Sequence, residues 1–142
     1  MQAYGLTETS AGGTTQLPHQ FKTNTSGSIL PCVEIRLVNW LEGGYRNTDT
    51  PNPRGEIWIG GDNVVLGYYN NKELTDEDFK VMNGVRYFAT GDIGEMINGE
   101  LKIIDRKKDL VKLCGGEFVS LNKGKYFYLL FIIRLLSLWS LN

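Results

Sequence analysis

The sequence predicts a mainly β protein, a distorted antiparallel β-barrel-like unit with one or two small helices. Two observations support this fold class. Short apolar stretches that alternate between two faces recur along the chain, and many of its 17 glycines separate them as turns. The strongest turn signal is Asn98-Gly99, because both central residues of such a hairpin turn need positive φ. The 142 residues are enough for a single globular unit at most.

The predicted elements follow the chain in order. Residues 1–28 are rich in Gly, Thr and Ser and are expected to form connecting loops. Strands are expected at 29–40, 55–61, 85–89, 93–97 and 101–104, with a further apolar stretch at 63–69. Trp58, Tyr68 and Tyr69 are expected to be core or strand-pairing aromatics rather than ligand contacts. A short helix is expected over 76–81 with Thr75 as its N-cap, because acidic residues come early in it. A charged connector at 106–109 then leads to a small hairpin over 110–120.

Charge is distributed unevenly along the chain. The formal net charge of -1 leaves no basic excess for a phosphate backbone, so general nucleic-acid binding is not expected. All 16 acidic residues precede Ser120, three of the 15 basic residues follow it, and the run 126–139 is nearly all apolar. Arg134 interrupts this run, which is shorter than the roughly 20 apolar residues of a spanning helix, so membrane adherence or aggregation is expected instead of a span. Cys32 and Cys114 are isolated, which indicates free thiols rather than a zinc site or a disulfide.

Four segments carry a family resemblance through their order and spacing. They are Tyr4-Gly5-Leu6-Thr7-Glu8-Thr9, Gly55-Glu56-Ile57 with Gly67-Tyr68-Tyr69, Thr90-Gly91-Asp92, and Ile104-Asp105-Arg106-Lys107-Lys108-Asp109. Each string alone is short enough to occur by chance. The ordered set over residues 1–123 resembles the AMP-forming, adenylate-forming superfamily. Within that superfamily, the detailed sequence of residues 87–95 and 103–112 resembles the long-chain fatty acid CoA ligases.

The resemblance implies a division of the chain into four parts. Residues 1–104 would be the C-terminal part of the large AMP-binding domain, and residues 105–109 the hinge. Residues 110–123 would begin the small C-terminal domain. Residues 124–142 depart from the family as a hydrophobic tail. Gly124-Lys125-Tyr126 is what a splice-donor sequence read as GGT-AAG-TAT would encode, so the tail is expected to be translated intron.

The resemblance also implies nucleotide-binding roles in the first part of the chain. The Tyr4 ring would stack on adenine, Gly5 would let backbone approach closely, and the Thr7 hydroxyl would bind the α-phosphate. Glu8 would hold Mg²⁺, and the Asp92 carboxylate would accept both ribose hydroxyls. Read alone, the first segment is also an ordinary glycine turn with a capping Thr, and Asp92 is also a common turn residue.

Further roles fall on the hinge and the loop after it. Arg106 would contact ribose and phosphate through its planar, permanently charged fork. Lys108 is the expected pivot of the hinge, so Thr7, Glu8, Arg106 and Lys108 form the expected catalytic set. Gly115 and Gly116 would admit the pantetheine arm of CoA beside backbone. The alternatives are a solvated charge run for the hinge residues and a hairpin turn for the glycines.

The function expected from the resemblance is a fragment of an AMP-forming long-chain fatty acid CoA ligase. In the parent enzyme, its partners would be a long-chain fatty acid, ATP and CoA at the cytoplasmic face of the endoplasmic reticulum or the mitochondrial outer membrane. The family's phosphate loop and adenylation lysine have no counterpart in this sequence, so the chain alone is expected to be inactive. The alternatives are a non-catalytic interaction or membrane-associating β-rich module, and a nucleotide sensor.

Overall fold

The computed structural model describes residues 1–19, 21–112 and 118–120. The chain separates into two compact units, of which the first is Met1–Ile104 and the second begins at Asp105. The assignment of these parts to a large domain, a hinge and a small domain stays a prediction.

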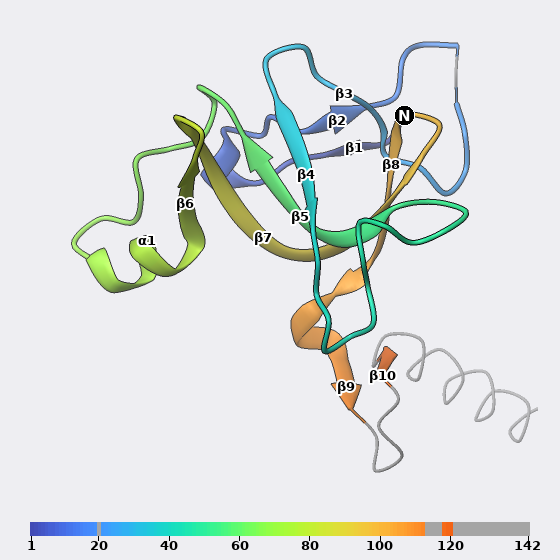
Figure 1. Ribbon diagram of the computed structural model, residues 1–142. Helices are drawn as coiled ribbons and strands as arrows, with labels where there is room; N and C mark the ends of the chain where they lie inside the picture. The colour runs from blue at the N-terminus through green and yellow to red at the C-terminus, as the bar shows by residue number, and fades with distance from the viewer. Residues whose placement is uncertain (20, 113–117, 121–142) are drawn as a thin grey trace, which may run out of the picture. The chain divides into compact units, whose positions relative to one another are not determined.

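One antiparallel sheet organises the first unit, with the strand order β1-β2-β3-β8-β7-β5-β4 and with β6 paired to β7 (Figure 1). The strands are β1 (Ala3–Tyr4), β2 (Thr14–Thr15), β3 (Gly27–Ile29), β4 (Glu34–Val38), β5 (Arg54–Gly60), β6 (Phe79–Met82), β7 (Val85–Ile97) and β8 (Glu100–Arg106). The prediction of a mainly β, antiparallel fold with few helices is confirmed. The sheet is open rather than closed into a barrel, since β1 and β4 lie at opposite ends of the strand order.

The larger core cluster is built on β5, which lies between β4 and β7. Ile57 and Ile59 are both fully buried, as the alternation of the sequence predicts for one face of a strand. In the register of β4, Leu37 lies opposite Ile57 and Ile35 lies opposite Ile59. Leu101 of β8 is also fully buried in this cluster. Each fully buried side chain of this size contributes roughly 1.5–3 kcal/mol relative to an exposed one.

The observed helix differs in its bounds from the predicted one, because Phe79 belongs to a strand and to a second core cluster. Helix α1 spans Lys72–Asp78, and its N-cap is Asn71, whose side chain accepts from the Leu74 N–H at 3.1 Å. Phe79 belongs to β6 and lies opposite Phe88 of β7, with ring centroids 5.1 Å apart. The predicted helix over 76–81 capped by Thr75 is therefore wrong, because the pairing of Phe79 draws the chain into the sheet.

Two further expectations are corrected. Residues 1–28 hold β1, β2 and the start of β3, since Ala3 pairs with Thr15 and Thr14 with Ile29. The apolar stretch 63–69 forms no strand. Its Tyr69 is 94% exposed rather than a core or strand-pairing aromatic.

The predicted turn at Asn98-Gly99 is confirmed by positive φ values of 49° and 81°. By contrast, the two strands predicted at 85–89 and 93–97 are one continuous strand, β7. Gly91, which lies between the two predicted strands, is part of β7 and does not end it.

In the second unit, the end of β8 is followed by the 3₁₀ turn η2 (Lys107–Asp109) and then by a small hairpin. Strand β9 (Leu110–Lys112) pairs antiparallel with β10 (Phe118–Ser120), which confirms the predicted hairpin. Its tip, with Gly115 and Gly116, and the tail 124–142 lie outside the described residues.

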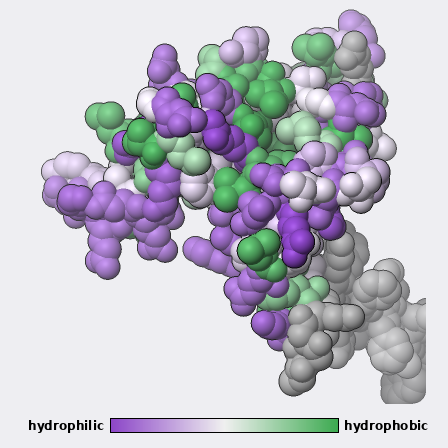
Figure 2. All heavy atoms as spheres, viewed as in Figure 1, coloured by the Kyte–Doolittle hydropathy of each residue, from purple (hydrophilic) through white to green (hydrophobic). Residues whose placement is uncertain are grey.

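Hydrophilic side chains gather over α1, which has no buried residue (Figure 2). Within the described ranges, no helix has the length and apolar character that a membrane crossing requires.

Candidate functional site

The fold brings together two predicted nucleotide-binding residues that are 88 positions apart. The Tyr4 hydroxyl donates to Asp92 Oδ2 at 2.7 Å. Tyr4 ends β1 and is half-buried, while Asp92 lies within β7 and is only 4% exposed. A phenol from β1 and a carboxylate from β7, two strands that are not neighbours in the sheet, thus lie in contact.

Asp92 owes its position to a β-bulge in β7. Glu56 of β5 pairs with Ile93 and Trp58 pairs with Ala89, so three residues of β7 lie opposite Ile57 alone. A bulge of this kind bends the strand and redirects a side chain that regular pairing would point elsewhere. The Thr-Gly-Asp motif is the bulge itself.

Internal hydrogen bonds fix the geometry of this bulge. Thr90 Oγ1 donates to the Ile57 carbonyl at 2.8 Å and accepts from the Asp92 N–H at 3.0 Å. Gly91 takes φ +70°, a conformation that L side chains rarely adopt. The turn interpretation of Asp92 is therefore half right, because the residue follows a positive-φ glycine, but inside a strand.

The Tyr4-to-Thr9 segment folds into a tight turn. The fully buried Thr9 accepts from the Leu6 N–H at 3.1 Å through its hydroxyl, which also donates to the Leu6 carbonyl at 3.2 Å. At Gly5, a Cβ would lie 2.3 Å from the Ala11 carbonyl oxygen. Gly5 is thus required by a close approach within the chain, and its approach to a nucleotide stays a prediction.

Thr7 and Glu8 lie on the 3₁₀ turn η1 (Thr7–Thr9). Thr7 is exposed, and Glu8 is half-buried. The Glu8 carboxylate Oε1 lies 3.1 Å from the hydroxyl of Tyr68, which lies equally far from Asp78 Oδ2. Burial, and then its hydrogen bonds to Asp78 and Glu8, raise the pKa of Tyr68 well above its usual range, so the hydroxyl is a proton donor throughout the neutral pH range.

A second loop, residues 63–65, is hydrogen-bonded to this turn. Asn63 Nδ2 donates to the Thr9 carbonyl at 3.0 Å, and Ser10 Oγ donates to the Asn63 carbonyl at 3.0 Å. The Val65 N–H donates to the Glu8 carbonyl at 3.0 Å. These bonds hold the main chain of η1 against residues 63–65.

The donor set at Glu8 fits a magnesium ion that is also held by phosphate oxygens. No group of three or more His, Cys, Asp or Glu side chains that could hold a metal occurs in the described part of the chain. Mg²⁺ is usually bound through one or two carboxylates together with substrate phosphates. The half-buried Glu8 carboxylate beside the exposed Thr7 is compatible with such a site, and its role as a Mg²⁺ ligand stays a prediction.

The remaining predicted residues belong to the second unit. Arg106 and Lys108 are exposed, and the Arg106 N–H donates to Asp105 Oδ1 at 2.8 Å. Their expected contacts with nucleotide stay predictions. Gly115 and Gly116 lie outside the described residues, so the expected CoA contact also stays a prediction.

Comparisons with known proteins identify the family. The AMP-binding enzyme family matches residues 1–69. Long chain acyl-CoA synthetase 8 of Arabidopsis thaliana is 54% identical over 124 residues, which are 86% of this chain and 17% of that protein. The chain belongs to the long-chain fatty acid CoA ligase family.

Solved structures agree with this family. The fatty acyl CoA synthetase of Mycobacterium tuberculosis matches with a TM-score of 0.62 and 35% identity, over 84% of this chain and 22% of that one. The O-succinylbenzoate coenzyme A synthetase of Bacillus subtilis, in complex with ATP and a magnesium ion, matches with a TM-score of 0.64 and 32% identity. That match covers 84% of this chain and 24% of that chain. This ligase segment therefore spans about a fifth of the length of the proteins that it matches.

The sequence did not indicate the contacts that Tyr68 and Asp78 make near Glu8 in this ligase segment. Tyr68 is predicted to be a core or strand-pairing aromatic, and its ring does pack on Phe79, but its hydroxyl contacts Glu8 and Asp78. Asp78 reads as one more acidic residue of a short helix. The signal available for Tyr68 was its Gly-Tyr-Tyr string, which does not reveal where the hydroxyl lies.

Proposed function

We propose that the complete protein carrying this segment is an AMP-forming long-chain fatty acid CoA ligase. In the first step, a fatty acid carboxylate attacks the α-phosphorus of ATP, which forms an acyl-adenylate and releases pyrophosphate. In the second step, the thiolate of CoA attacks the acyl carbon, which forms acyl-CoA and releases AMP. The observation that carries the proposal is the 2.7 Å contact that brings Tyr4 and Asp92 of two separate family motifs into one site.

Four predicted site residues of the first unit have defined tasks in this proposal. Asp92 accepts hydrogen bonds from the ribose hydroxyls, and the Tyr4 ring stacks on adenine while its hydroxyl holds the carboxylate. Thr7, exposed at the start of η1, donates to the α-phosphate. Glu8 holds Mg²⁺, which offsets phosphate charge as it develops.

The second unit completes the reaction cycle in this proposal. Arg106 binds ribose and phosphate, Lys108 acts as the pivot of the hinge, and Gly115 and Gly116 line the path of CoA. Exposure of Arg106 and Lys108 supports these roles, since a pivot must change its backbone angles during turnover. We further propose that the complete ligase works at the cytoplasmic face of the endoplasmic reticulum or the mitochondrial outer membrane.

Exchange of labelled pyrophosphate into ATP tests the proposed activity. The complete protein should catalyse exchange that requires a long-chain fatty acid and Mg²⁺, and it should form acyl-CoA when CoA is added. The 142-residue chain alone should show no exchange. Absence of fatty-acid-dependent exchange in the complete, folded protein would contradict the proposal. The interaction-module alternative is not favoured, because the relatives of this segment are ligases.

A further inference from the structure

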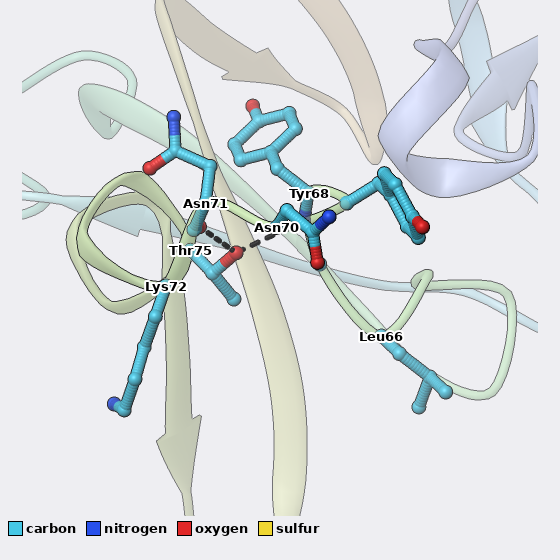
Figure 3. Close-up of a pocket in the computed structure, with 8 residues that line it drawn as sticks. Leu66, Tyr68, Asn70, Asn71, Lys72 and Thr75 are labelled. Atoms are coloured by element: carbon cyan, nitrogen blue, oxygen red, sulfur yellow. Dashed lines mark hydrogen bonds between the residues drawn. The ribbon is translucent and has the colours of Figure 1, made fainter.

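The main chain beside Tyr68 is fixed by three short-range features. The Tyr68 N–H donates to Thr75 Oγ1 at 2.9 Å, and Thr75 Oγ1 donates to the Asn71 carbonyl at 2.7 Å (Figure 3). At Gly67, with φ +147°, a Cβ would lie 2.4 Å from Thr75 Cγ2. The loop therefore closes tightly on α1, and Tyr68 leaves it at a defined position.

The ring of Tyr68 is also fixed by packing. It lies edge-on to Phe79, with centroids 5.5 Å apart and an interplanar angle of 73°. Tyr68 packs against the buried cluster of Val64, Phe79 and Phe88. A phenol on a packed ring has one place for its hydroxyl, in contrast to the flexible end of an exposed side chain.

That hydroxyl is shared by two carboxylates. It lies 3.1 Å from both Glu8 Oε1 and Asp78 Oδ2. Within the described ranges, no Lys or Arg forms an ion pair with Glu8 or Asp78, and the Glu8 carboxylate has no hydrogen-bond partner besides Tyr68. Glu8 is thus anchored through its main chain by Val65 and through Oε1 by Tyr68, while Oε2 is left to other partners.

We propose that Tyr68 is a positioning residue of the ligase, which orients the Glu8 carboxylate toward the Mg²⁺ of bound ATP. The proposal rests on the proposed function, in which Glu8 holds that ion. Tyr68 has one proton, so it donates to Glu8 or to Asp78, and the second carboxylate adds negative charge beside the first. Removing the hydroxyl leaves Glu8 free to rotate and places two carboxylates together without a donor between them.

The test is the substitution Tyr68→Phe in the complete protein, with Tyr69→Phe as the matched control. Phenylalanine keeps the ring that packs on Phe79 and removes only the hydroxyl. Tyr69 is the adjacent residue and is 94% exposed, so its hydroxyl should be dispensable. Two readouts are measured. One is the Mg²⁺ concentration for half-maximal pyrophosphate exchange, and the other is binding of Mn²⁺–ATP, followed by the loss of the electron paramagnetic resonance signal of free Mn²⁺.

Loss of an outer-shell partner of a metal ligand typically weakens metal affinity by about 10–100-fold. We expect Tyr68→Phe to raise both the half-maximal Mg²⁺ concentration and the dissociation constant of Mn²⁺–ATP by about tenfold, the low end of that range. The thermal midpoint should stay close to that of the wild type, and Tyr69→Phe should change neither readout.

A double substitution separates positioning from a structural role. If Tyr68 acts through Glu8, then adding Tyr68→Phe to Glu8→Gln should not weaken Mn²⁺–ATP binding further. Equal metal dependence of Tyr68→Phe and wild type, or additive losses in the double variant, would overturn the proposal. Absent exchange in wild type would count against the ligase function, whereas Mn²⁺–ATP binding would still test Tyr68 in the same protein.

Discussion

Two contacts between a phenol and a carboxylate hold predicted site residues of the first unit in different ways. Tyr4 donates to Asp92 at 2.7 Å, and Asp92 is nearly inaccessible in the bulge of β7. Tyr68 lies between Glu8 and Asp78, at 3.1 Å from each, and Glu8 is half-buried on a short 3₁₀ turn.

The difference lies in what determines the position of each carboxylate. Asp92 is placed by backbone pairing, since β5 fixes the bulge and Thr90 bonds both strands within it. Glu8 is placed by a side chain from a loop, and that side chain in turn depends on Phe79. We therefore expect the Asp92 side to resist side-chain changes structurally and the Glu8 side to depend on a single hydroxyl.

The largest expected effect is on nucleotide affinity in Asp92→Asn. The amide loses the charge that strengthens two hydrogen bonds to ribose, each worth about 1.5–3 kcal/mol, so ATP affinity should fall by about 100-fold or more. Isothermal titration with ATP measures this fall in the complete protein. The thermal midpoint serves as the folding control, and ATP binding at wild-type strength would refute the ribose role.

Substitutions at two glycines compare the stability lost through steric overlap with the stability lost through a strained backbone conformation. Gly5→Ala places a Cβ against the backbone of Ala11, which cannot move aside as a side chain can, and should destabilise by about 3 kcal/mol. Gly91→Ala meets nothing within 4 Å and bears only the strain of positive φ, about 1–2 kcal/mol. Urea unfolding followed by tryptophan fluorescence ranks the two.

Gly84→Ala is the matched control for this ranking. Gly84 has φ +80° and also meets nothing within 4 Å, so its substitution should resemble Gly91→Ala in unfolding. It should leave nucleotide binding unchanged, because Gly84 lies in the turn between β6 and β7. A smaller loss for Gly5→Ala than for these two would contradict the close packing of the Tyr4-to-Thr9 turn.

Tyr4→Phe isolates the first phenol from its ring. The ring remains available to stack on adenine, whereas the hydrogen bond to Asp92 is lost, so ATP affinity should fall by about tenfold at most. The dissociation constants of ATP and 2′-deoxy-ATP are measured together. If the Tyr4 hydroxyl orients Asp92 toward ribose, the ratio of the two dissociation constants should move closer to 1 in Tyr4→Phe. An unchanged ratio would limit the role of Tyr4 to stacking.

The smallest expected effect concerns acid stability on the same strand as the bulge. The hydrogen bond from Asn52, and then that from Lys102, lower the pKa of Glu95 below 4.5. A lowered pKa stabilises the fold at pH values above 4.5, and this contribution is lost as the pH falls through the lowered value.

Asn52→Ala removes the main cause of that shift. It should destabilise the protein by about 1 kcal/mol at neutral pH and make little difference once Glu95 is protonated. Urea midpoints across an acid series measure the difference between the two proteins. A difference that grows as the pH falls would contradict the assigned sign.

Local chemistry made part of this fold predictable. Asn98-Gly99 takes the conformation that the sequence predicts, because a two-residue turn is determined by the φ preferences of its own residues. The strand at 55–61 is visible for a similar reason, since Ile57 and Ile59 alternate with more polar positions. The paired strands β9 and β10 were also predicted.

Elements that depend on distant partners were not predictable. Residues 79–81 resemble the end of a helix until Phe79 is placed opposite Phe88. Thr90-Gly91-Asp92 resembles a turn between two strands until the register with β5 is known. The two-residue strands β1 and β2 have no apolar pattern of their own and exist only through pairing.

The sequence by itself determined the family, the mainly β class and the identity of the candidate nucleotide residues, because these depend on residue type and order. Tertiary structure alone decided that Tyr4 meets Asp92 and that Tyr68 reaches Glu8. Contacts across 88 and 60 positions depend on strand register and on ring packing, which no local stretch of sequence specifies.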